Sequence, residues 1–308
     1  MLVLACPLCQ SPKIRRIAQL TGNQLRALWK ALGHVFSQEA WGKISADFAV
    51  QKLQCQSCRF IFFDPALAGN QAFYRELEHD EYFAEARPEF QRTLRFARGQ
   101  GLGRVLDVGC GSGVFLDLAR ESGMETYGLE LNETAWEKAR CKGHQIFSEL
   151  LPELDPERLG RFDLITLFQV LEHVAEPVEV MKSAARFLKP GGYISIAVPS
   201  EQGICRFSDC DPAQWPPHHV SRWRLQDLEQ LARAAGLKLA ESGADLLLGS
   251  DLEHVWTIRN RLAEFRGKKS RPQSPGWLKA GVLIYRKSGM KWVFPKWGLS
   301  IYGYFKAE

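Results

Sequence analysis

The hydrophobic pattern changes near residue 101, where short apolar runs begin to alternate with amphipathic segments. Runs of strand length are followed by segments whose apolar positions recur every three or four residues. This pattern predicts strands at 104–108, 126–129, 144–147, 162–168 and 193–198, and helices at about 113–122, 132–142, 175–188 and 225–236. Such alternation is typical of a parallel sheet with helices on both faces. Two later apolar segments, 237–248 and 299–305, predict further strands.

The first hundred residues follow a different order. Thr21 and Gln24 form a capping box before a helical pattern whose apolar residues share one face: Leu25, Leu28, Trp29, Leu32, Val35 and Phe36. Residues 47–54 predict a strand, and 70–98 predict mostly helix with a break near Pro88. We expect three parts: a small module at 1–66, a helical linker or lid at 67–100, and an α/β domain at 101–308 with an insertion at about 251–297.

Composition narrows the class of protein. Of 308 residues, 45% are hydrophobic and 24% are charged, so the chain can bury a sizeable core and wholesale disorder is not expected. No apolar run approaches the roughly 18 residues of a membrane-spanning helix, and the short apolar start lacks the basic flank of a signal peptide. Eight cysteines are too few for a disulfide scaffold. These features favour a cytoplasmic protein whose paired cysteines bind metal.

Charge is distributed unevenly. Residues 101–250 carry 22 acidic and 15 basic side chains, whereas 251–308 carry 12 basic and 4 acidic ones. The late segment interleaves basic with aromatic residues: Lys268, Lys269, Arg271, Trp277, Lys279, Tyr285, Arg286, Lys287, Lys291, Trp292, Phe294, Lys296 and Trp297. This composition suits an anionic lipid surface or RNA, and it equally suits a packed insertion with a solvated basic face.

The most informative motif lies at the end of the first predicted strand of the α/β domain. Asp107 is followed by glycines at 109, 111 and 113, and then by a helix. Glycine lets the backbone turn sharply and lets a ligand approach the main chain. The spacing differs from the dinucleotide fingerprint, and Asp107 would repel a pyrophosphate. A cationic ligand such as S-adenosylmethionine would instead attract this carboxylate.

A second carboxylate, Glu130, ends the next strand, where such a residue can accept the hydroxyls of a ribose. With these motifs, Phe162–Ile165, Val170–Val174 and Leu188–Gly192, the chain resembles class I S-adenosylmethionine-dependent methyltransferases. The resemblance implies a Rossmann-like seven-stranded methyltransferase sheet with helices on both faces. Its final strand is reversed, and 299–305 would be that strand.

The resemblance also assigns cofactor contacts. It places the methionine end of S-adenosylmethionine on Gly109, Cys110, Gly111 and Gly113 and the ribose on Glu130. Further expected contacts are Asp107, Leu131, an upstream aromatic residue at Tyr82, adenine contacts at Ser148 and Glu149, and Phe168 and Gln169 beside the methyl group. The alternative for Tyr82 is ordinary helix packing.

Two cysteine pairs flank the N-terminal module. Cys6, Cys9, Cys55 and Cys58 have the C-x2-C spacing of a closed, structural four-thiolate zinc site. The order resembles methyltransferases with an N-terminal zinc module, a group that includes sugar C-methyltransferases, and it implies a zinc-ribbon-like fold. Gln10 and Arg59 stand where those relatives usually have glycine. The alternative is two unmetallated pairs.

Two histidines lie where we expect the methyl acceptor to bind. His218 and His219 follow the fifth predicted strand of the α/β domain, in a loop expected over the methyl group. Either could act as general base, or it could cap a helix or bond to backbone. A remoter combination is metal binding with Cys205 and Cys210. We expect Glu172 and His173 to support the start of the next helix rather than to act as a catalytic pair.

The sequence therefore predicts an S-adenosylmethionine-dependent methyltransferase. By analogy, its substrate is a small molecule, first of all a sugar, sugar nucleotide, glycan or natural-product intermediate. RNA methylation is the second hypothesis. A protein that binds the cofactor without transferring the methyl group is the third.

Overall fold

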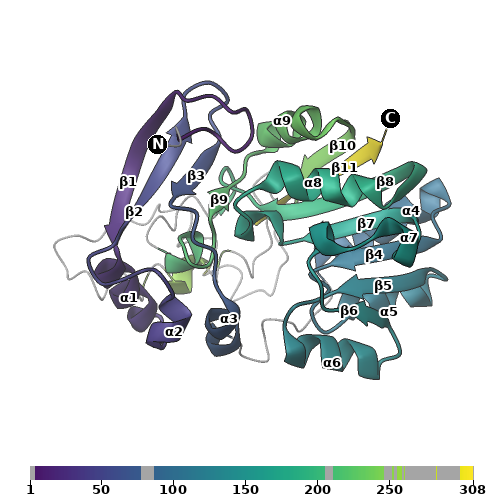
Figure 1. Cartoon of the computed structure of the whole chain (residues 1–308), viewed down its shortest axis with the longest axis horizontal. Coiled ribbons are helices and arrows are strands. Elements are labelled where there is room, and N and C mark those ends of the chain that lie inside the picture. The colour runs from purple at the N-terminus through teal and green to yellow at the C-terminus, as the bar shows by residue number, and fades with distance from the viewer. Residues whose placement is uncertain are drawn as a thin grey trace.

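The computed structural model contains two sheets that share a continuous interior (Figure 1). It describes residues 4–77, 87–204, 211–245, 252, 255–258, 260, 282 and 299–307. The larger sheet has seven strands in the order β10 (Leu237–Ala244), β11 (Ser300–Ala307), β8 (Leu188–Pro199), β7 (Phe162–Phe168), β4 (Arg104–Val108), β5 (Glu125–Leu129) and β6 (Gln145–Phe147).

The pairing in this sheet is mixed. The pairs β4–β5, β4–β7, β5–β6 and β7–β8 are parallel. Strand β11 runs antiparallel to both β8 and β10. The expected reversed final strand is therefore confirmed. Strand β8 begins five residues before its predicted start, so Lys189–Gly192 belongs to the strand rather than to a turn before it.

Helices cover both faces, as Figure 1 shows. They are α4 (Pro88–Gln100), α5 (Val114–Glu121), α6 (Glu133–Cys141), α7 (Pro156–Leu159), α8 (Pro177–Arg186) and α9 (Leu225–Ala235). Within β7, Leu164 and Phe168 pack with α4 and α5, whereas Ile165 and Leu167 pack with α8 and α9. The period of two sends alternate side chains to opposite faces, so both faces of the strand are buried.

A small antiparallel sheet follows the order β1 (Ile14–Thr21), β2 (Ala49–Cys55), β3 (Ile61–Asp64) and β9 (Ser221–Arg222). Its fourth strand, β9, belongs to the loop at 211–223 that carries His218 and His219, which we call the acceptor loop. This strand follows β3 by more than 150 residues. Sequence reasoning missed β1 because most of its side chains are exposed and give no buried face. It missed β9 because a two-residue strand has no periodicity.

The N-terminal helices pack beside this sheet. They are α1 (Gly22–Ala31), α2 (Gln38–Trp41) and α3 (Gln71–Leu77). The capping box of Thr21 and Gln24 is confirmed. The predicted helical face extended too far, because α1 ends at Ala31 and Val35 is 80% exposed. Phe36 does reach the core, but through a turn that sets it against Trp29.

The expected insertion lies largely outside the described residues, and so do all the basic and aromatic residues named for it. Leu252, Val255 and Val282, which are described, form a small buried cluster with Ile204. Within the part of the chain that the structure describes, every helix falls short of the length and apolar character that crossing a membrane requires.

Candidate active site

The glycine loop connects β4 to α5 with three residues in the left-handed region. Gly109, Gly111 and Gly113 have φ of 73°, 53° and 79°, values that side-chain-bearing residues rarely adopt. The amides of Gly109 and Cys110 both donate to the Leu129 carbonyl, at 2.8 and 3.0 Å. These bonds fix the loop against the carboxyl end of β5, where parallel sheets bind ligands.

Gly128, one residue earlier on β5, makes room for this loop. A Cβ atom there would lie 2.6 Å from Cys110 Sγ and 2.7 Å from Ile146 Cδ1. We predict that Gly128→Ala displaces the loop, destabilises the fold by about 1–3 kcal/mol, and weakens cofactor binding. Thermal unfolding and S-adenosylhomocysteine titration measure both effects.

The matched control is Gly99→Ala in α4. A Cβ at Gly99 meets no atom within 4 Å, so alanine there should stabilise the helix by about 0.5–1 kcal/mol and leave binding unchanged. Equal affinity in both variants would contradict the role given to Gly128.

A buried carboxyl group, that of Asp107, and a partly buried one, that of Glu130, flank the loop. Asp107 is 3% exposed and accepts a hydrogen bond from Thr166 Oγ1 at 2.6 Å. Its burial, reinforced by the charge of Glu130, raises the pKa of Asp107 to about 7. Glu130 Oε2 accepts from the Gly111 amide and Oε1 from the Asn132 amide, both at 2.8 Å. Burial also raises the pKa of Glu130.

We predict that binding of S-adenosylhomocysteine weakens as the pH falls below about 7. The cationic amino group of this ligand favours the charged form of Asp107, and the raised pKa leaves that carboxyl largely protonated in mildly acidic solution. Affinity should therefore be about tenfold lower at pH 6 than on the plateau above pH 8. Calorimetric titrations across pH 5.5–8.5 measure the profile. A flat profile in the wild type would contradict this role for Asp107.

A cavity opens beside the loop at the carboxyl edge of the sheet. Its lining residues are Arg87, Phe90, Asp107, Gly109, Cys110, Gly111, Ser112, Val114, Phe115, Phe168 and Gln169. The rings of Phe90, Phe115 and Phe168 pack with centroids 5.0–5.4 Å apart. This aromatic wall lies opposite polar backbone, a combination typical of small-molecule sites.

The structure brings six of the expected cofactor residues into this cavity: Asp107, Gly109, Cys110, Gly111, Phe168 and Gln169. Gly113 begins α5, and Glu130 contacts the loop through the Gly111 amide. Leu131 is 49% exposed, Ser148 is exposed, and Glu149 pairs with Arg158 at 2.7 Å. Tyr82 lies outside the described residues. All these assignments stay predictions.

Sequence reasoning missed Arg87, Phe90 and Phe115 in the lining. The first two come from the start of α4, so the segment expected as a linker or lid contributes to the cavity. It also missed Thr166, a polar residue in the otherwise apolar strand β7, which lies in register with Asp107. A polar residue inside an apolar strand was the sequence signal that could have identified Thr166.

Gln169 directly follows β7 and has a strained backbone conformation. Its φ is 56°, unusual for a residue with a side chain. The side-chain amide donates to Ser300 Oγ at 3.1 Å and to Glu89 Oε1 at 3.3 Å, and the backbone N–H donates to the Ala197 carbonyl. These contacts with β8, β11 and α4 hold the turn at the cavity edge.

His218 and His219 lie outside the residues that line the cavity. Both rings are buried and stack on each other with centroids 4.4 Å apart. Burial lowers the pKa of His218 to about 4 and the pKa of His219 well below its usual value. A neutral imidazole with so low a pKa is a weak general base near pH 7. The catalytic assignment of either residue stays a prediction.

Glu172 and His173 form the short 3-10 helix η3 (Leu171–His173) next to these rings. Glu172 is 1% exposed, and burial raises the pKa of its carboxyl to about 8. Neither residue is the N-cap of α8, which is Glu176, a residue without a side-chain capping hydrogen bond; the expectation that the pair supports the start of this helix stays a prediction.

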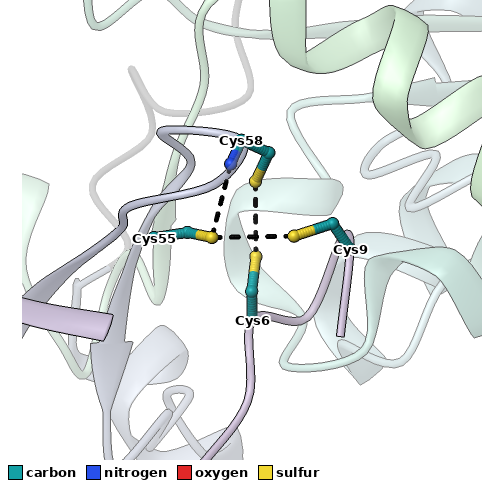
Figure 2. A group of neighbouring side chains, drawn as sticks. All are labelled: Cys6, Cys9, Cys55 and Cys58. Atoms are coloured by element: carbon teal, nitrogen blue, oxygen red, sulfur yellow. Dashed lines mark hydrogen bonds between the residues drawn. The ribbon is translucent and has the colours of Figure 1, made fainter. Parts of the chain in front are cut away.

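The four paired cysteines converge between the β2–β3 turn and the N-terminal segment (Figure 2). Cys6 Sγ lies 3.5 Å from Cys58 Sγ, Cys9 Sγ lies 3.6 Å from Cys55 Sγ, and all four sulfurs lie within 4.8 Å of one another. Zinc–sulfur bonds of about 2.3 Å in a tetrahedron place sulfurs about 3.8 Å apart. The donor set therefore fits a structural zinc ion.

The backbone around the sulfurs also suits metal binding. The Cys58 amide donates to Cys55 Sγ at 3.4 Å. Burial raises the pKa of Cys55, but hydrogen bonds from the Cys58 and Ser57 amides outweigh it and lower the pKa to about 7. Gln10 and Arg59 adopt φ of 56° and 70°, the left-handed conformation that glycine would supply. The turns therefore form without glycine.

The cysteine site is joined to the acceptor loop. Strand β9 pairs with β3, and Trp223 packs against Phe60 with ring centroids 4.9 Å apart. Arg224 Nη2 donates to the Cys58 carbonyl at 2.9 Å. Loss of the metal would therefore disturb the loop that carries His218 and His219.

Fold and site define a class I S-adenosylmethionine-dependent methyltransferase domain with a small N-terminal module and a four-cysteine cluster. The family described as "Methyltransferase domain" matches residues 77–242, more than half of the chain. The chain therefore belongs to this family. S-adenosylmethionine is the methyl donor of the class.

Curated relatives match a shorter stretch. The ubiquinone biosynthesis O-methyltransferase of Bordetella avium is 34% identical over 97 residues, covering 30% of this chain and 40% of that protein. That of Methylococcus capsulatus is 35% identical over 100 residues, covering 30% and 41%. The chain thus spans about two fifths of the length of these relatives.

Solved structures with a similar outline include magnesium protoporphyrin IX methyltransferase of Synechocystis PCC 6803 with bound S-adenosylhomocysteine. It has a TM-score of 0.44 at 12% identity, covering 71% of this chain and 81% of that one. A methyltransferase of Archaeoglobus fulgidus has a TM-score of 0.44 at 19% identity, covering 70% and 94%. The family assignment rests on the sequence match to the domain.

Proposed function

We propose that the protein transfers the methyl group of S-adenosylmethionine to a small molecule, and that the accepting atom is a hydroxyl oxygen. The observation that carries the proposal is the arrangement of Asp107, the glycine loop and Glu130 beside one cavity. The hydroxyl acceptor is suggested by the curated relatives, whose names specify O-methylation.

The residues present fit S-adenosylmethionine. When bound, this cofactor supplies an electrophilic sulfonium methyl group. Asp107 would hold the cationic methionine end, and the left-handed glycines would let the main chain approach it. Glu130 still has lone pairs for two ribose hydroxyls after accepting its two amide bonds. Phe90, Phe115 and Phe168 would exclude water from the reacting side, where orientation contributes most to the rate.

The acceptor would enter between the cavity and the loop at 211–223. This loop is bound to η3 through the Val220 amide, which donates to the Glu172 carbonyl at 2.8 Å. It also forms β9 of the small sheet. A sugar, sugar nucleotide, glycan or natural-product intermediate is one branch of the proposal, motivated by the N-terminal cysteine pairs.

The test is transfer of labelled methyl from S-adenosylmethionine into fractionated cell extract by the purified protein. We expect label in a small-molecule fraction, and we expect hydriodic acid to release it as iodomethane because it is an ether methyl. Label that hydriodic acid does not release would contradict O-methylation. Label confined to RNase-sensitive precipitate would contradict the small-molecule proposal and favour RNA.

A protein that binds the cofactor without catalysis gives a different result. It would bind S-adenosylhomocysteine with normal affinity and transfer no label into any fraction. That combination would contradict the proposed enzyme while leaving the cofactor site intact.

A further inference from the structure

Two buried histidines and one partly buried histidine converge on the acceptor side of the molecule. His173 comes from η3, and His218 and His219 come from the loop that precedes β9. One ring nitrogen from each lies within 4.8 Å of the other two. Ring centroids are 4.4–4.9 Å apart. We name these residues the histidine cluster.

Two rings of the histidine cluster are oriented by backbone carbonyls. His173 Nδ1 lies 2.7 Å from the His218 carbonyl oxygen, and His218 Nδ1 lies 2.9 Å from the Ala213 carbonyl oxygen. A carbonyl only accepts, so both rings carry hydrogen on Nδ1 and a lone pair on Nε2. Histidines that ligate metals are held in this way by partners on the other ring nitrogen.

Glu172 provides an independent observation. Its side chain is 1% exposed, and neither carboxylate oxygen has a hydrogen-bond partner among the described residues. Its Oε1 lies 3.9 Å from His173 Nε2. His219 Nδ1 is likewise buried without a partner in that part of the chain. Buried carboxyl groups are normally hydrogen-bonded, paired or bound to metal, so this grouping requires an explanation.

We propose that the histidine cluster and Glu172 bind a divalent first-row transition-metal ion. Three imidazole nitrogens and one carboxylate oxygen suit zinc or iron(II). Metal–nitrogen bonds of about 2.0–2.1 Å place tetrahedral donors about 3.4 Å apart. The three nitrogens lie within 4.8 Å of one another and Glu172 Oε1 lies 3.9 Å from His173 Nε2, so the rings and the carboxylate would have to move closer together to bind one ion. The neighbouring cation Arg222 is paired with Glu201.

The position of this site gives it a role in the reaction. Glu172 follows the cavity residue Gln169 by three residues. The positive charge of Arg87, which lines the cavity, acts on both Asp107 and Glu172. The ion would therefore lie next to the methyl-donor cavity. With its four protein ligands in place, the ion would take an acceptor hydroxyl as a fifth ligand and lower the pKa of that hydroxyl, whose proton would pass to solvent. This role rests on the proposed methyl transfer, whereas metal binding does not.

Cobalt(II) titration of the chelator-stripped full-length protein tests the proposal. Thiolate and imidazole sites differ in colour, because only bound thiolates give intense sulfur-to-cobalt charge-transfer absorption. We expect two equivalents in the wild type, of which one gives that absorption and the other gives only weaker ligand-field bands. Elemental analysis of the zinc-loaded protein should also give two equivalents.

Variants of the two sites show which site binds each equivalent of cobalt(II). Glu172→Gln combined with His219→Gln should weaken the second equivalent at least about 100-fold and keep the charge-transfer band. Cys55→Ser combined with Cys58→Ser should remove the band and keep the second equivalent. His34→Gln, outside the histidine cluster, should keep both. Glu172→Gln alone, which preserves side-chain shape, should weaken the second equivalent about 10–100-fold, and S-adenosylhomocysteine binding verifies that each variant is folded.

The proposal is overturned if the wild type binds only the thiolate-type equivalent. It is also overturned if folded variants lacking Glu172 and His219 keep the second equivalent with unchanged affinity. Metal binding without methyl transfer would support this site and contradict the proposed function. Failure of the metal site and failure of the proposed methyl transfer can therefore be told apart.

Discussion

Asp107→Asn should weaken binding of S-adenosylmethionine by about 30- to 1,000-fold, because it removes a buried carboxylate of the cavity lining that would face the cationic end of the ligand. The fold tolerates the change, since asparagine keeps an oxygen that can accept from Thr166 Oγ1. Above pH 7 the variant should be at least as stable as the wild type, because no charge is then buried at this position. Calorimetric titration and thermal unfolding measure the two quantities.

Asp163→Asn is the matched control. Asp163 lies at the start of β7, at the amino-terminal edge of the sheet, whereas Asp107 lies near the carboxyl end of the neighbouring strand β4. Asp163 accepts from the Gly103 and Arg104 amides and pairs with Lys189 at 2.9 Å. These partners hold the pKa of Asp163 below its usual value, against the opposing effect of partial burial. This variant should lose stability and keep its cofactor affinity. The reverse pattern, with Asp107→Asn binding normally, would contradict the cofactor site.

Removing the four-cysteine site should produce the largest loss of stability. Structural zinc contributes its binding free energy to folding, and the four cysteines join the N-terminal segment to the β2–β3 turn. We expect Cys55→Ser with Cys58→Ser to lower the melting temperature by about 10 °C, as a loss of roughly 3–5 kcal/mol implies. Differential scanning calorimetry measures the shift.

The same variant should lose methyl transfer more than cofactor binding. Trp223 and Arg224 contact the cysteine module and belong to the acceptor loop, whereas the cofactor cavity draws its lining from other elements. Cys141→Ser, at an exposed position, is the control and should change neither quantity. An unchanged melting temperature in the double variant would contradict a structural metal.

Short-range signals carried most of the sequence prediction. The Asp107 to Gly113 motif, Glu130 and the alternation of strands and helices are local patterns. The alternation predicted a parallel sheet with helices on both faces, and the motifs carried the family resemblance that implied a reversed final strand. The residues that line the cavity were harder to predict from local patterns. Arg87 and Phe90 precede the sheet in an amphipathic helix, and only the packing of α4 brings them to the glycine loop.

The histidine cluster shows the same limit more strongly. His173 and His218 are 45 residues apart, and the grouping depends on the loop before β9, whose Val220 amide donates to the Glu172 carbonyl of η3. Glu172 resembles a helix-start residue in the sequence, and only its burial without hydrogen bonds indicates another role. Strand β9 was also missed, because it has only two residues and pairs with β3, which precedes it by more than 150 residues.

The most direct test of the account is a methyl balance. Purified protein, S-adenosylmethionine labelled in the methyl group and the small-molecule fraction of a cell extract are incubated together. S-adenosylhomocysteine and labelled product are then both quantified by mass spectrometry. The two should form in equal amounts, and Asp107→Asn should strongly reduce both at cofactor concentrations that just saturate the wild type. Normal cofactor binding with no S-adenosylhomocysteine formed from any fraction would contradict the account.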